Sequence, residues 1–338
     1  AFPPLSGRSS FARVGGRRAR PPFLVAERAR NVAHRRPWAT SNAMRFKAKL
    51  SNEKLGVFQG VAATLEKIGP LGVVHLSDTS IQLCIRNDSG QGDDVLAFSA
   101  LEQKELFHDW RIESQSGNCI LLQLTLQNLL DALHSARNAP QCQLKLTKRN
   151  GQAALCLETR ALEVDVIHDI PVTVMRASEY QYYCPPDVPQ PQVQLELPMS
   201  RNLKTVIDRL KNISRYIYLH GEMTGALTLR AETDSLVIQT YFSNLRPRLD
   251  SLDESCEENR GTVKVDTKKL ATVLSSYSLR FDSIIMCLIE GYSLVVHVIL
   301  SPSNCGTLTF YLPVMSINDE DMWVEEEDRR DGGEDGRQ

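Results

Sequence analysis

A row of basic side chains lies in one short stretch of the sequence, "SRNLKTVIDRLKNISR", residues 200–215. Lysine and arginine at repeated spacings are the side chains that hold phosphate groups, but they are equally typical of a solvated surface helix. The row consists of Arg201, Lys204, Lys211 and Arg215, with Asp208 in the gap and Arg209 beside it. This stretch alone leaves both interpretations open.

The apolar residues of the same stretch recur at helical spacing and form one stripe. They are Leu203, Val206, Ile207, Leu210 and Ile213. Pro198 and Ser200 are helix-start signals, because proline is tolerated at a helix entry and serine can cap the first amides. The pattern therefore predicts an amphipathic helix over residues 200–214, about 22 Å long, with its cations on the outer side.

Charge is unevenly distributed along the chain, whose net formal charge is -2. Residues 1–43 carry nine arginines against one acid, and residues 316–338 carry ten acids against three arginines. The middle is mildly acidic, with 27 basic and 30 acidic residues. Any affinity of this middle for nucleic acid must therefore come from the local arrangement of cations, which argues against a tight DNA binder acting alone.

The sequence contains no constellation of catalytic or metal-binding residues. The eight cysteines are scattered, mostly within apolar runs, and are typical of reduced core thiols in an intracellular protein. No zinc spacing and no phosphate-binding or nucleophile motif occurs, so we expect no metal and no cofactor. His168 and Asp169 are neighbours on a predicted strand and would point to opposite faces. The acids of 250–258 predict a solvated loop and leave a metal-dependent nuclease as a distant alternative.

The composition divides the chain into five parts. Residues 1–43 have no apolar period and are predicted to be disordered; this arm fits a targeting segment, a nuclear-localisation patch or an extension outside the working protein. Residues 176–192 are proline-rich and predict a linker between two domains, 44–175 and 193–315. Residues 316–338 predict a disordered acidic tail. No stretch is long and apolar enough for a membrane span.

The two predicted domains repeat one order of elements, namely strand, helix, several strands, helix, several strands, at an offset of roughly 140–150 residues. The first helices are predicted in "NEKLGVFQGVAATLEKI" and "LTLQNLLDALHSARNA", and the last one in "TKKLATVLSSYS". The repeat predicts an α+β fold in which each domain packs two helices on one face of antiparallel sheet.

Six phrases in this repeat resemble the Hus-type subunit of the checkpoint sliding clamp, the nine-one-one complex, a relative of PCNA. They are "MRFKAKL" from Met44, "ALEQKELF" (100–107), "ALHSARNA" (132–139), "HDIPV" (168–172), "LKNIS" (210–214) and "LTFYLPVM" (308–315). The resemblance covers essentially residues 44–315 and leaves out the arm and the tail.

The resemblance implies the DNA-clamp fold and a heterotrimeric ring that encircles double-stranded DNA in the nucleus. It implies a non-catalytic subunit acting in DNA damage checkpoint signalling and as a scaffold for DNA repair. Its implied partners are two other checkpoint-clamp subunits, a clamp loader, repair enzymes and checkpoint kinase activators. A replication processivity clamp or another checkpoint-clamp subunit is the alternative.

A ring lined by helices gives the cations a role, because phosphate contacts guide DNA without reading its sequence. The expected DNA-facing residues are Lys54, Lys67, Arg137, Arg201, Lys204, Lys211, Arg215, Lys268 and Lys269. Exposed strand edges are the expected joints between subunits. We assign these edges to Leu155, Leu157, Val295 and Val296.

Overall fold

The computed structural model describes residues 44–86, 94–137, 139–160, 164–248, 259–302 and 305–317. The predicted arm, the acidic loop 250–258 and the tail from residue 318 lie outside the described residues.

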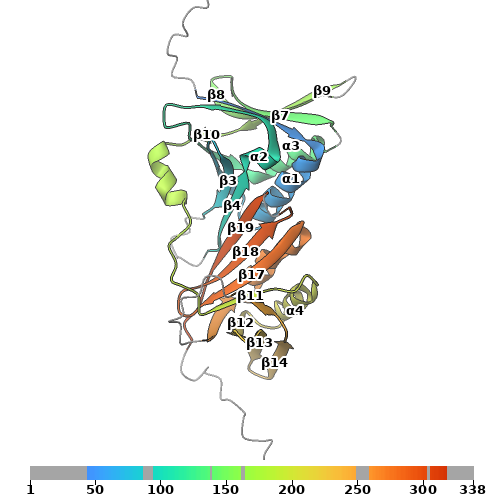
Figure 1. The fold of residues 1–338 in the computed structure, drawn as a ribbon, viewed down its shortest axis with the longest axis vertical. Coiled ribbons are helices and arrows are strands. Elements are labelled where there is room, and N and C mark those ends of the chain that lie inside the picture. Colours follow the sequence, from blue (N-terminus) through green and yellow to red (C-terminus); the bar gives the residue numbers. More distant parts are fainter. Residues whose placement is uncertain are drawn as a thin grey trace, which may run out of the picture. The chain divides into compact units, whose positions relative to one another are not determined.

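Four successive β-α-β-β-β units make up this part of the chain (Figure 1). The first is β1 (Arg45–Ser51), α1 (Asn52–Glu66), β2 (Leu71–Leu76), β3 (Ser80–Ile85) and β4 (Leu96–Glu102). The second is β6 (Ile120–Thr125), α3 (Leu126–Ser135), β7 (Gln141–Arg149), β8 (Gln152–Arg160) and β9 (Asp165–Pro171). The third is β11 (Val193–Glu196), α4 (Asn202–Leu210), β12 (Tyr216–Glu222), β13 (Ala226–Thr233) and β14 (Leu236–Phe242). The fourth is β16 (Arg260–Asp266), α5 (Thr267–Val273), β17 (Phe281–Ile289), β18 (Ser293–Leu300) and β19 (Gly306–Pro313).

Short elements connect these units. They are α2 (Gln103–Leu106), β5 (Phe107–Glu113), β10 (Thr173–Val174), the 3-10 helix η1 (Ala177–Tyr183), β15 (Arg246–Pro247) and the 3-10 helix η2 (Leu274–Ser278). The proline-rich segment 176–192 therefore begins with a helical turn, which the sequence analysis did not predict.

The units are interlocked in pairs, because the leading strand of each one joins the three-stranded meander of its neighbour. Strand β1 pairs with β7, β6 with β2, β11 with β17, and β16 with β12. Among the described residues this gives three antiparallel sheets, of order β5-β1-β7-β8-β9, β10-β6-β2-β3-β4-β19-β18-β17-β11-β15 and β14-β13-β12-β16. Neither unit of a pair can complete its sheet without the other.

The pairing of β4 with β19 joins the first half of the chain to the second within the ten-stranded sheet (Figure 1). Its register runs from Gly306 opposite Leu101 to Tyr311 opposite Leu96. Gly306 has φ +143°, and a Cβ atom there would lie 2.2 Å from the carbonyl oxygen of Ala100. Only glycine permits this approach of the two backbones.

The two faces of the ten-stranded sheet have different covers, because successive side chains of a strand point to opposite faces. Val74 and Leu122 belong to the main core with the helices, whereas their neighbours Val73 and Leu121 lie in a separate apolar cluster on the other face. The segment 175–192 covers that outer face. There the ring of Tyr180 stacks on His75 with centroids 4.0 Å apart, and burial lowers the pKa of His75 against the opposing effect of its hydrogen bond with Gln82.

Helix α4 is shorter than predicted, since it spans Asn202–Leu210 instead of 200–214. After Leu210 the chain tightens into a turn in which the amide of Ile213 donates to the carbonyl of Leu210. The Ser214 hydroxyl donates to the carbonyl of Tyr216 and thereby leads the chain into β12. Ile213 is consequently 44% exposed and is not part of the buried stripe.

We expect Gly306→Ala to lower the free energy of unfolding by about 3 kcal/mol, because the new Cβ forces β19 away from β4. Gly261→Ala is the matched control, since its Cβ meets neighbours only at ordinary contact distances of 3.5 Å and more. Chemical denaturation of both variants measures the difference. Equal stability of the two would contradict the tight β4–β19 approach.

Candidate nucleic-acid interface

Helices from both halves of the chain form one layer, here called the helix layer: α1, α3, α4, α5 and η2. Helix α1 packs against α3, α4 packs against α5, and α1 also contacts η2. Gly60 permits this last contact, because a Cβ there would lie 2.9 Å from Leu279 Cδ2. The apolar sides of the helices are buried in the main core, so their polar sides form a solvent-facing surface.

The cations of α4 are partly neutralised by an acid on the same helix. Lys204 and Lys211 both bind the carboxylate of Asp208, the latter with 2.8 Å between Nζ and Oδ1. Burial alone would raise the pKa of Asp208, but hydrogen bonds from the two lysines outweigh it and hold that pKa below its usual value. Asp208 is therefore ionised at neutral pH, and the three side chains carry a net charge of about +1.

The other predicted cations of the second half are arranged differently. Arg201 precedes α4 and is exposed. The guanidinium of Arg215 lies over the ring of Tyr216, 5.0 Å from its centroid, instead of continuing the helical row. Lys268 and Lys269 begin α5, where their backbone amides donate to the Asp266 carboxylate that caps the helix. Lys268 is exposed and Lys269 half-buried.

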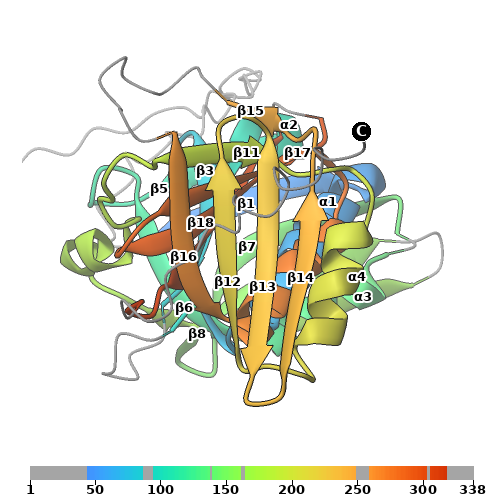
Figure 2. The same cartoon turned by 90° about the horizontal axis from the view of Figure 1, so that it is seen from below.

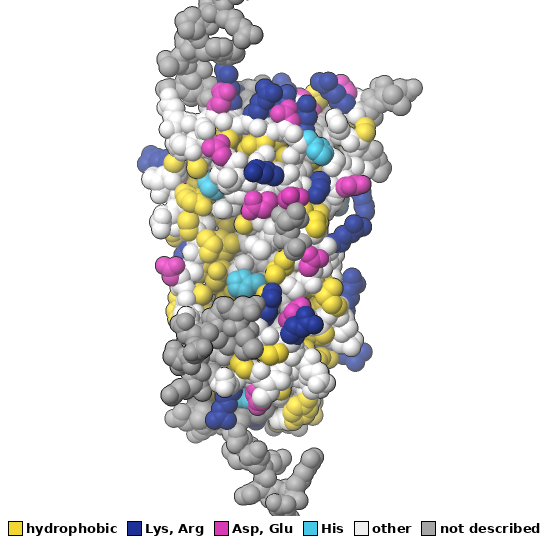
Figure 3. All heavy atoms as spheres, in the orientation of Figure 1, with side chains coloured by type: hydrophobic (Ala, Val, Ile, Leu, Met, Phe, Trp, Pro, Cys, Tyr) yellow, Lys and Arg dark blue, Asp and Glu magenta, His cyan; other side chains and the backbone are white. Residues whose placement is uncertain are grey.

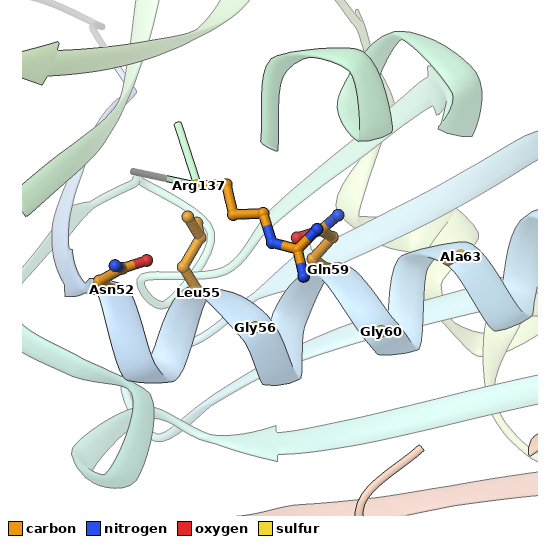
Figure 4. A pocket seen from close by; sticks show the side chains of 7 residues that line it. All are labelled: Asn52, Leu55, Gly56, Gln59, Gly60, Ala63 and Arg137. Carbon is orange, nitrogen blue, oxygen red and sulfur yellow. The ribbon is translucent and has the colours of Figure 1, made fainter. Parts of the chain in front are cut away.

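In the first half, the three predicted cations lie in three different environments. Lys67 follows α1 and is exposed. Lys54 is half-buried beside α2: burial raises the pKa of the Cys305 thiol, and the nearby charge of Lys54 opposes that rise. Arg137, just after α3, extends across the solvent side of α1 (Figure 4). It closes one side of a hollow of about 270 Å³ lined by Asn52, Leu55, Gly56, Gln59, Gly60, Ala63 and Arg137.

The structure thus brings the predicted cations onto one layer, although not as one continuous row. In Figure 3, lysine and arginine side chains recur along the side of the view where Figure 1 shows α1, α3 and α4. Such a surface attracts phosphates without fixing their register. No group of three or more metal-ligating side chains occurs among the residues described.

The neighbours His168 and Asp169 point to opposite faces of β9, as predicted. His168 hydrogen-bonds the Ser135 hydroxyl at the end of α3, whereas Asp169 forms an ion pair with Arg149. The two side chains therefore do not act as one acid–base pair.

The predicted sheet edges are wrong. Leu155 and Leu157 lie in β8, which is hydrogen-bonded on one side to β7 and on the other to β9. Val295 and Val296 lie in β18, which is likewise paired on both sides, with β17 and β19. All four side chains are buried. Alternating apolar residues indicate a strand, but they do not give its position in the sheet.

The free edges of the two smaller sheets are β9 and β14 (Figure 2 shows β14 next to β13). Both are apolar and exposed: Ile167 on β9 is 53% exposed, and Tyr241 on β14 is 69% exposed. The sequence signal for β9 was its run of valine and isoleucine, which the sequence analysis read only as a strand. Sequence reasoning also missed Asn52, Gln59 and the glycines of the hollow, because small and amide residues on a helix give no charge signal.

Comparison with solved structures identifies the class of fold. The chain is similar to the proliferating cellular nuclear antigen of Entamoeba histolytica, with a TM-score of 0.63 and 16% identity over 80% of this chain and 99% of that one. It is also similar to a chain of the PCNA2–PCNA3 complex of Sulfolobus tokodaii, with a TM-score of 0.59 and 14% identity over 79% and 98%. The fold is the predicted DNA-clamp fold.

Comparison of sequences identifies the family. The family described as Hus1-like protein matches residues 44–316. The chain is 31% identical to the checkpoint protein hus1 homolog of Dictyostelium discoideum over 81% of this chain and all of that protein. It is 27% identical to the human checkpoint protein HUS1, over 81% and 100%. The chain belongs to the Hus1-like protein family, and the predicted resemblance is confirmed.

We expect Asp208→Asn to strengthen the binding of duplex DNA by the assembled clamp, because it releases Lys204 and Lys211 toward phosphate. Each new lysine contact steepens the slope of log K against log salt by about 0.9. Equilibrium binding to a short linear duplex over a salt series measures this slope.

Asp109→Asn is the matched control for that experiment. Asp109 also holds two cations, Lys49 and Arg111, each at 3.4 Å, but on a strand of the five-stranded sheet. Equal effects of the two variants would mean that overall charge, and not the α4 surface, determines binding.

Proposed function

We propose that the chain is a non-catalytic subunit of a heterotrimeric checkpoint clamp that encircles double-stranded DNA. The helix layer is the observation that carries this proposal: four units of the clamp fold present their polar helix faces on one surface, and that surface bears the cations. A surface of this kind meets the phosphate backbone when the fold is closed into a ring. The name "checkpoint protein" of the relatives supports DNA damage checkpoint signalling and a scaffold role in repair.

The modest charge of the helix layer is consistent with a ring. A clamp that is closed around DNA is held by topology, so its cations need only guide the duplex and can remain weak enough for sliding. The ion pairs of Asp208 with two lysines lower the charge in that direction. A protein that grips DNA from one side would need more uncompensated cations.

Ring closure needs two joints per subunit, and the described residues offer two exposed apolar edges. The first is β9 with Val166 and Ile167, and the second is β14 with Val237 and Tyr241. An unpaired strand carries free backbone donors and acceptors that another chain can complete. The two edges differ in sequence, which favours two different partner subunits. The repeats 44–175 and 193–315 would be the two clamp domains of each such joint.

The remaining partners follow from this assignment. A closed ring requires a clamp loader to open it at DNA, and a checkpoint role brings kinase activators and repair enzymes to its outer face in the nucleus. No described helix is both long and apolar enough to cross a membrane. No comparison favours the alternative of a metal-dependent nuclease.

Co-expression with the two other checkpoint-clamp subunits of the same organism tests the proposal. We expect a complex with one copy of each subunit and retention on closed circular DNA. The protein purified alone should not form a trimer. A stable homotrimer would instead indicate a replication processivity clamp.

We expect Ile167→Lys to abolish binding of one partner subunit and Tyr241→Lys to abolish binding of the other, while each variant keeps the unaffected partner. Loss of a central apolar contact at an interface weakens binding by about tenfold or more. Pairwise pull-downs of the purified subunits measure both effects.

Leu71→Lys is the control, because Leu71 is also exposed, at 51%, but lies on β2 inside the ten-stranded sheet. If both edge variants kept both partners, β9 and β14 would not be the joints.

A further inference from the structure

The hollow on α1 has a rim of hydrogen-bond donors without acceptors. Arg137 contributes a guanidinium, and Asn52 and Gln59 contribute amides. Figure 4 shows the Arg137 side chain reaching over the helix to the level of Gln59, between Gly56 and Gly60. None of these three polar side chains forms a hydrogen bond or ion pair with another residue that the structure describes. One fixed positive charge with several N–H donors fits an anionic oxygen ligand.

The floor of the hollow lacks side chains. Gly56, Gly60 and Ala63 follow one another along the solvent side of α1. A glycine inside a helix destabilises it relative to alanine, so each one calls for a reason. Gly60 has one in its contact with Leu279, but a Cβ at Gly56 would meet nothing within 4 Å. Packing within the chain therefore does not require glycine at position 56.

We propose that the hollow receives a backbone phosphate of the encircled duplex. The Arg137 guanidinium donates to the phosphate oxygens, and the amides of Gln59 and Asn52 donate to the phosphate or the adjoining sugar. The missing side chain at Gly56 lets the DNA backbone come close to the helix. The proposal rests on the proposed function, because it needs the solvent side of the helix layer to face DNA.

This site gives the first half of the chain a phosphate contact of its own kind. In α4 the lysines are held by Asp208, and a phosphate must compete with that carboxylate. Arg137 has no such competitor among the described residues. The hollow therefore combines an available charge with a defined shape, whereas α4 supplies charge alone.

Gly56→Leu tests the site by filling the hollow without changing any charge. We expect the assembled heterotrimer to bind a short linear duplex about fivefold more weakly, the effect of losing one partly exposed ionic contact. The slope of log K against log salt should become shallower by about 0.9, one phosphate contact. Arg137→Ala should give the same two changes. The double variant should be no weaker than either single variant, because both remove one contact.

Two controls keep the result specific. Asn128→Leu adds an exposed leucine to α3 in the same helix layer, away from the hollow. Arg176→Ala removes one arginine from the segment on the outer face of the ten-stranded sheet. Both should bind the duplex like the unaltered clamp within twofold.

The outcomes that overturn this inference differ from failure of the proposed function. Unaltered duplex binding by Gly56→Leu, or fully additive effects in the double variant, would overturn the phosphate site while the clamp itself still binds DNA. Loss of partner subunits from Gly56→Leu would also overturn it, since the hollow would then be a protein contact. If the unaltered heterotrimer did not assemble or did not bind the duplex, the proposed function would fail first.

Discussion

The antiparallel pairing of β4 with β19 is the interaction on which the rest of the structure depends. It turns two interlocked pairs of β-α-β-β-β units into one continuous ten-stranded sheet. Because the backbones meet so closely at Gly306 and Ala100, the relation between the two halves is set by main-chain hydrogen bonds. Side-chain packing then follows from that register, including the contact of α1 with η2 across the junction.

The continuous sheet gives the molecule two functional surfaces by the simple alternation of strand side chains. One face buries the apolar sides of the helices and thereby directs their polar sides outward as a single layer. The other face carries smaller apolar clusters that segment 175–192 covers with Met175, Tyr180 and Tyr183. A layer that binds DNA and a face that remains available for other contacts can therefore coexist on one thin sheet.

The electrostatics of the helix layer are moderate by construction. Asp208 binds two of the lysines of α4, Arg215 lies over an aromatic ring, and Lys54 lies toward a flank beside α2. Individual exposed charges of this kind contribute little binding energy each, and salt screens them. Such a surface suits a subunit whose hold on DNA comes from enclosure by a ring.

Much of the fold could be predicted from the sequence, because helix periodicity, strand alternation and the internal repeat are local properties. The amphipathic pattern of α1 and the core residues Leu203, Ile207 and Leu210 of α4 are examples. The prediction of α4 was too long by several residues, since the bonds of Ser214 to Tyr216 and Glu232 that lead the chain into β12 are tertiary contacts. The resemblance to the Hus-type clamp subunit was also readable, from short phrases spread over both repeats.

The order of strands in the sheets was decided only by the tertiary structure. Val295 and Ile167 read alike in sequence, yet one lies in an interior strand and the other on an exposed edge, because position in a sheet depends on partners far away in the chain. The same holds for the charges: whether a lysine faces phosphate or a neighbouring carboxylate depends on distances of a few ångströms. The sequence by itself thus determined the elements and the family. Long-range backbone pairing decided which edges are free, which cations are available and where a glycine leaves a hollow.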